Sequence, residues 1–102
     1  MKKKKTTREL IPEYLQPTYD LITAAFPTGI EADLYIPLLA FLKPHMSLRN
    51  LTDVVCIVTG RDYHLAYADV VDAMGAELTP QDELRLRQRL EPHGLTAWFA
   101  ES

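Results

Sequence analysis

Residues 47–75 read SLRNLTDVVCIVTGRDYHLAYADVVDAMG, and this stretch decides the fold class. Ser47 is a suitable N-cap and Gly60 a suitable C-cap, so together they predict a helix over residues 48–59. The β-branched run Val54–Val58 would favour a strand by propensity alone. We give more weight to the two helix-end signals, because their separation matches an ordinary helix.

The second half of the stretch repeats the pattern. Asp62 can cap a helix over residues 63–74, and Gly75 can end it. Apolar residues recur along this helix at spacings of three and four, at Tyr63, Ala66, Tyr67, Val70, Val71 and Met74. The two segments therefore predict consecutive helices joined by a short glycine turn.

Similar signals outside this stretch predict helices over residues 17–25, 33–43 and 80–90. Pro17 begins the first of them after a short turn over residues 12–16, because proline is well tolerated in a first turn. Asp33 is the expected cap of the second, with Pro37 in or just after its first turn. Thr79-Pro80 begins the third, with Thr79 as the cap.

The chain is expected to be all-α, a compact bundle of about five short helices in one domain over residues 10–102. A basic flexible arm over residues 1–9 precedes it. The helix over residues 33–43 is apolar over most of its circumference and is the expected central helix. A C-terminal apolar piece is expected to fold back over the bundle, and it contains Leu95, Trp98 and Phe99. The residues expected in the core are Leu38, Leu39, Leu42, Val54, Val58, Val70, Met74 and Leu86.

Charge is unevenly distributed along the 102 residues. Five of the eleven basic residues come first, at Lys2, Lys3, Lys4, Lys5 and Arg8. All fourteen acidic residues follow from Glu9 onward, so the body is strongly acidic. An acidic body disfavours duplex binding, because neutralising phosphates needs a basic face. The lysines could still make weak contacts with nucleic acid, although we favour the alternative, a solvated and disordered tail.

No pattern of catalytic or metal-binding residues is visible. His45, His64 and His93 are too widely spaced to pair on one helix, as a zinc site would need. The four glycines lie at predicted helix ends rather than in a phosphate-binding loop. The helix over residues 63–74 carries two carboxylates and no Lys or Arg, which disfavours a DNA-reading role. We therefore expect no enzyme activity, no metal and no cofactor.

Aromatic side chains supply the main functional hypothesis. Amphipathic rings favour interfaces as well as core edges. We expect at least two of them to share one partly exposed patch that binds a partner helix or a second copy, from the set Tyr35, Tyr63, Tyr67 and Trp98. The alternative is that each ring is buried singly with a solvated polar tip. Arg85 and Arg89 share a helix face and are either a second partner contact or a solvated surface with local ion pairs.

Residues 26–95 also show two longer motifs. The first is FPTGI at residues 26–30 followed by LYIPLLAFL at residues 34–42. The second, looser motif comprises Asp82, Arg85-Leu86, Arg89-Leu90 and His93-Gly94-Leu95. With these motifs the chain resembles a family of small helical proteins of unknown function that is abundant in mycobacteria and other actinobacteria.

This chain departs from that family pattern at three positions. Leu34 stands where the family favours Asp, Glu83 stands where an apolar residue is usual, and Leu95 replaces a Trp. The resemblance implies a compact helical fold for a divergent member. It implies no activity and no functional residues.

The expected function is a non-enzymatic protein–protein interaction module, and the alternative is weak nucleic-acid binding through the lysine arm. The longest apolar run is five residues, Val54–Val58, so no membrane span is expected. No apolar segment follows the basic start, and Cys56 has no second cysteine to pair with. Both observations favour a cytoplasmic location.

Overall fold

The computed structural model describes residues 11–101, and within them every regular element is helical. The α-helices are α1 Gln16–Ala25, α2 Ala32–Leu42, α3 Leu48–Thr59, α4 Tyr63–Met74, α5 Pro80–Leu90 and α6 Leu95–Glu101. Short 3-10 turns are η2 Glu13–Leu15, η3 Lys43–His45 and η4 Glu91–His93. The predicted all-α fold is confirmed. The basic arm over residues 1–9 lies outside the described residues.

The helix-end signals of α3 and α4 act where the sequence predicts them. α3 and α4 begin and end at the predicted residues. The Ser47 hydroxyl accepts a hydrogen bond from the backbone N–H of Asn50, and the Asp62 carboxylate accepts one from that of His64. Gly60 has φ = 72°, a left-handed conformation that glycine adopts without strain. These contacts are local, which explains why they are visible in the sequence.

The start of α2 differs from the prediction. α2 begins at Ala32, so Asp33 lies inside the first turn and is not the cap. Glu31 holds the cap position without a side-chain hydrogen bond to the helix. Pro37 consequently lies deeper in the helix than expected and offers no N–H to the carbonyl of Asp33. The helix persists because it is buried on most sides, with Leu34 and the whole run 38–42 in the core.

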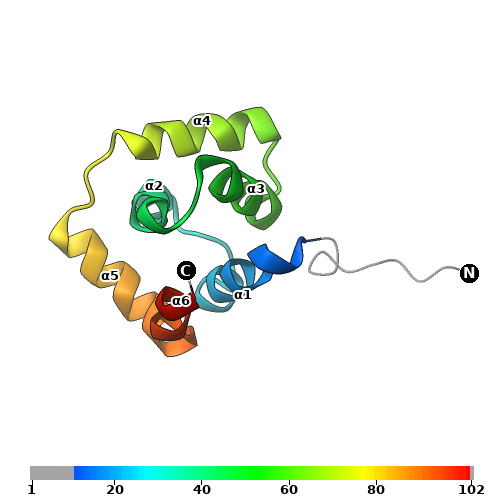
Figure 1. Ribbon diagram of the computed structural model, residues 1–102. Helices are drawn as coiled ribbons and strands as arrows, with labels where there is room; N and C mark the ends of the chain where they lie inside the picture. Colours follow the sequence, from blue (N-terminus) through cyan, green and yellow to red (C-terminus); the bar gives the residue numbers. More distant parts are fainter. Residues whose placement is uncertain (1–10, 102) are drawn as a thin grey trace, which may run out of the picture.

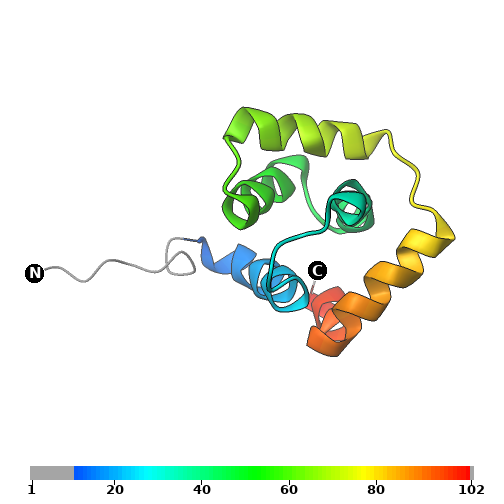
Figure 2. The same ribbon diagram turned by 180° about the vertical axis from the view of Figure 1, so that it is seen from behind.

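The helices surround α2. α4 packs against α2 and α3, α5 packs against α2 and α1, and α1 also contacts α3 and α6. α6 confirms the expected return of the C-terminal piece, with Leu95 and Trp98 buried. Figures 1 and 2 show α4 along one edge of the molecule, with α2 and α3 on its inner side and no other described helix on its outer side.

Most of the predicted core is buried, but two residues differ. Val58 is only half-buried. Met74 is wrong as a core residue, because 41% of its surface is exposed. Its position on α4 is rotated away from the helix face that meets the core, which carries Ala66, Val70 and Ala73.

Candidate interaction surface

The most distinctive feature of the surface is a row of exposed apolar side chains on α4, which we name the α4 stripe. Its members and their exposed fractions are Tyr63 44%, Tyr67 44%, Val71 45% and Met74 41%. At about 100° per residue these positions fall within an arc of roughly 80°, so they form one continuous line along the helix. The helix that carries this line, α4, lies along an edge of the molecule in Figures 1 and 2.

The stripe exists because the apolar arc of α4 is wider than its contact with the rest of the protein. Ala66, Val70 and Ala73 are fully buried. The two alanines have short side chains, which allows α4 to pack closely on α2 and α3. The bulky members of the arc lie on one flank of this contact and stay in water. In the sequence the buried and exposed halves appear as a single stripe, and Val71 and Met74 were not recognised as surface residues.

Lys43 fixes the far end of α4. Its ammonium group donates hydrogen bonds to the carbonyl oxygens of Ala73, Met74 and Ala76, at 2.9 to 3.1 Å. A cation at the C-terminal end of a helix also interacts favourably with the helix dipole. The stripe therefore sits on a helix that is held at its C-terminal end by α2 and its following turn.

Tyr35 lies apart from the stripe and is tied into the fold. Its hydroxyl donates a hydrogen bond of 2.7 Å to Oδ2 of Asp69, and Nε of Arg61 lies 2.9 Å from the same oxygen. Burial, followed by the hydrogen bond to Asp69, raises the pKa of the Tyr35 hydroxyl above its usual value. These contacts connect α2 to the middle of α4 and to Arg61 before its start, so Tyr35 has a positioning role in this surface.

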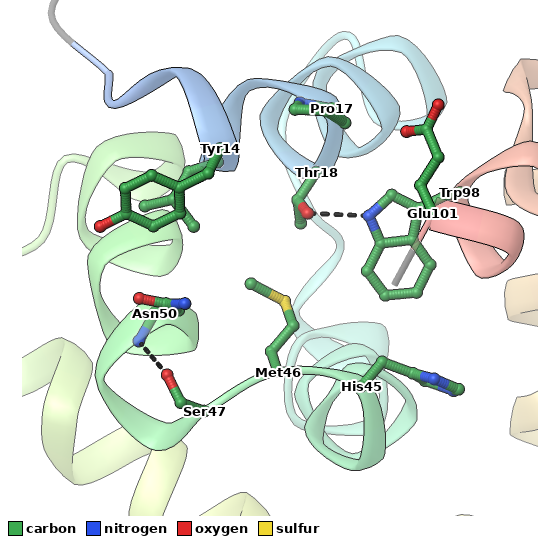
Figure 3. A pocket seen from close by; sticks show the side chains of 10 residues that line it. Tyr14, Pro17, Thr18, His45, Met46, Ser47, Asn50, Trp98 and Glu101 are labelled. Atoms are coloured by element: carbon green, nitrogen blue, oxygen red, sulfur yellow. Dashed lines mark hydrogen bonds between the residues drawn. The ribbon is translucent and has the colours of Figure 1, made fainter.

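Trp98 is also separate, because only 6% of its surface is exposed. Its indole N–H donates a hydrogen bond of 2.8 Å to Oγ1 of Thr18. It forms one wall of a hollow of about 390 Å³, and Figure 3 shows Tyr14 on the opposite side with Met46 between them. The indole N–H is already paired with Thr18, so we assign Trp98 to the packing of α6 on α1.

Arg85 and Arg89 make their contacts within the chain. Arg85 forms an exposed ion pair with Asp33, 2.9 Å away. Arg89 donates from Nε and Nη2 to the carbonyl oxygen of Ala25, and from Nη1 to Glu31. Both arginines therefore connect α5 to elements earlier in the chain, a role that the surface pattern of α5 does not reveal.

A second hollow of about 480 Å³ lies between the end of α1, the start of α2 and the end of α3. Its apolar wall includes Phe26, Ile30 and Val58, and its one cationic group is Arg61. That guanidinium is already paired with Asp69. Within residues 11–101, no group of three or more His, Cys, Asp or Glu side chains is placed to hold a metal ion.

Of the six residues predicted for an interaction surface, the structure brings Tyr63 and Tyr67 together and leaves the others elsewhere. Lys2, Lys3, Lys4 and Lys5 fall outside the part of the chain that the structure describes. No described helix combines the length and apolar character needed to cross a membrane.

Comparison with models of protein families, with curated proteins and with solved structures found no match to this chain. The resemblance of residues 26–95 to an actinobacterial family therefore stays a prediction.

Proposed function

We propose that this protein is a non-enzymatic module that binds a partner protein through the α4 stripe. The observation that carries the proposal is the alignment of four large apolar side chains, each more than 40% exposed, on one face of one helix. Scattered apolar residues are normal on a protein surface, but a contiguous row is typical of an interaction site.

The exposed apolar area is large enough for its burial to contribute favourable free energy to binding. A Tyr side chain that is 44% exposed presents about 90 Å², taking roughly 200 Å² as its full area. The four side chains together present on the order of 300 Å², comparable with the largest apolar patch of an ordinary monomer. Covering that area releases on the order of several kcal/mol before the costs of association are subtracted.

A matched pair of variants tests the proposal. Val71 and Leu65 both lie within α4 and are 45% and 51% exposed, but they point about 120° apart around the helix. Val71→Asp places a charge in the stripe, whereas Leu65→Asp places the same charge outside it. Because both side chains are exposed, both variants should fold like the wild type, as checked by circular dichroism.

The assay is selection from a displayed library of random peptides of about 20 residues on the wild-type protein. Enriched peptides are then measured against both variants. The proposal expects affinity to fall by at least ~10-fold with Val71→Asp and by less than ~2-fold with Leu65→Asp, since a charge is costly only in a buried contact. Failure to enrich any peptide, or equal responses of the two variants, would contradict it.

A further inference from the structure

The size of the α4 stripe restricts what can bind there. From residue 63 to residue 74 it runs for about 16 Å, at ~1.5 Å per residue. Its exposed area, on the order of 300 Å², is well below the ~800 Å² that each partner buries in a standard protein–protein interface. Two whole copies that met only through this row would bury too little surface to form a stable pair. One helix of roughly three turns matches the row in length.

The surroundings of the stripe are acidic. From Asp62 to Leu84 the chain contains no Lys or Arg. Exposed carboxylates lie at the N-terminal end of α4, on its outer flank and beyond its C-terminal end, at Asp62, Asp72 and Glu77. Between the stripe and Asp72 stands Ala68, whose short side chain leaves room for a long basic side chain to cross.

Two cationic side chains that contact α4, Arg61 and Lys43, already have partners within the chain. Arg61 is paired with Asp69, and Lys43 donates to three carbonyl oxygens at the end of the helix. Among the described residues, none of Asp62, Asp72 and Glu77 forms an ion pair. The apolar row therefore has a negatively charged border.

We infer that the segment bound at the α4 stripe is a basic amphipathic helix, an inference that rests on the proposed function. Its apolar side chains, at spacings of three, four and seven residues, pack against Tyr67 and Val71. Lys or Arg along its edges meets the carboxylates around the stripe. A second copy of this chain packed stripe to stripe would instead bring two negatively charged borders together, and like charges oppose such contacts.

Three synthetic peptides of about 18 residues test the charge requirement. They share one apolar face of Leu and Ile and differ only at the flanking positions, which hold Lys, Gln or Glu. Binding of each fluorescently labelled peptide to the full-length protein is followed by anisotropy. The Lys peptide should bind ~10-fold more tightly than the Gln peptide at ~50 mM salt, and the Glu peptide should bind most weakly. The difference should shrink toward ~300 mM salt, because these charges are exposed.

Two sets of variants test which carboxylates are responsible for the higher affinity of the Lys peptide. Asp72→Asn combined with Glu77→Gln should remove most of the advantage of the Lys peptide. Glu91→Gln should leave that advantage within ~2-fold, because this exposed acid lies beyond α5, away from α4. A similar loss with Glu91→Gln would mean that the overall negative charge attracts the peptide, and would overturn the inference.

The outcomes separate this inference from the proposed function. Equal affinities for the three peptides, all reduced by Val71→Asp, would overturn the basic-helix inference and leave the proposed function in place. A dimer in sedimentation that is lost with Val71→Asp would overturn it in favour of a second copy. Binding of no peptide, or binding unaffected by Val71→Asp, would count against the proposed function itself.

Discussion

Replacing Arg89 with Met should destabilise the protein more than the surface position of this arginine suggests. Nε and Nη2 of Arg89 donate to the carbonyl oxygen of Ala25, at 3.2 and 3.0 Å, where α1 ends. The guanidinium also lies over the ring of Phe26, 4.4 Å from its centre. Met keeps most of the apolar stem, so the substitution removes these polar contacts and little of the packing.

The magnitude follows from these contacts. A hydrogen bond to a charged group contributes ~1.5–3 kcal/mol when shielded from water. The Arg89 side chain is 36% exposed, so we reduce the contribution of the two bonds to about 1 kcal/mol in total. The contact with the Phe26 ring adds ~0.5–1 kcal/mol. The exposed ion pair with Glu31 adds little, and the expected loss is about 1.5–2 kcal/mol.

Urea denaturation followed by circular dichroism measures this loss. Arg85→Met is the matched control, because it removes an arginine of the same helix that makes only exposed ion pairs. Its loss should be clearly smaller, since exposed pairs contribute little. If the two variants lose stability equally, the contacts of Arg89 with α1 are not what holds α5 in place.

The same comparison has a predicted pH dependence. The hydrogen bond from Arg89 lowers the pKa of Glu31 below its ordinary 4.5. A lowered pKa in the folded state gives stability that is present above pH 4.5 and is lost as the pH falls through the folded value. Arg89→Met removes this contribution, so the difference in free energy of unfolding between wild type and variant should become smaller in acid. The share of the difference that comes from the contacts with Ala25 and Phe26 should remain. A difference that grows in acid would refute the role given to the Arg89–Glu31 pair.

Three further substitutions probe the core and the support of α4. Leu39→Ala should lower the free energy of unfolding, measured by urea denaturation, by ~2–5 kcal/mol, because Leu39 is only 1% exposed. Leu84→Ala, at a position that is 57% exposed, should lower it by less than ~0.5 kcal/mol. Equal losses would show that α2 is not the central helix. Trp98→Phe should lower the free energy of unfolding by ~2 kcal/mol, because it leaves the buried Thr18 hydroxyl without its hydrogen-bond donor. The double variant with Thr18→Val should lose less stability than the two single variants added together. Strictly additive losses would argue against this hydrogen bond. Lys43→Met should lower the free energy of unfolding by ~1–2 kcal/mol and increase the rate of amide hydrogen exchange in the last turn of α4. An unchanged exchange rate there would contradict the capping role of Lys43.

The sequence alone determined the helices whose ends depend on nearby residues. Ser47 and Thr79 bond to backbone N–H groups three residues away, and Gly60 adopts its left-handed conformation within a single residue. Such contacts need no distant partner, so they can be predicted from short motifs. The cap of α2 was predicted two residues too late, at Asp33 instead of Glu31, because the Glu31 side chain makes no hydrogen bond to the helix.

The candidate site could be predicted only in part. The spacing of Tyr63 and Tyr67 placed them on one face of α4, and both are exposed there. Val71 and Met74 have the same helical spacing as the buried residues, so their exposure could not be seen in the pattern. Trp98 was expected at an interface, but it packs α6 onto α1 through Thr18, a residue 80 positions away.

Only the tertiary structure decided which flank of the apolar arc of α4 stays in water. An amphipathic pattern states how wide the apolar face of a helix is, but the area that neighbouring helices can cover depends on where they cross it. Here α2 and α3 meet the line of Ala66, Val70 and Ala73, and the bulkier flank remains uncovered. The same reason explains Arg89, because a long side chain bonds to whatever carbonyl the fold brings within its reach, and that partner lies 64 residues away.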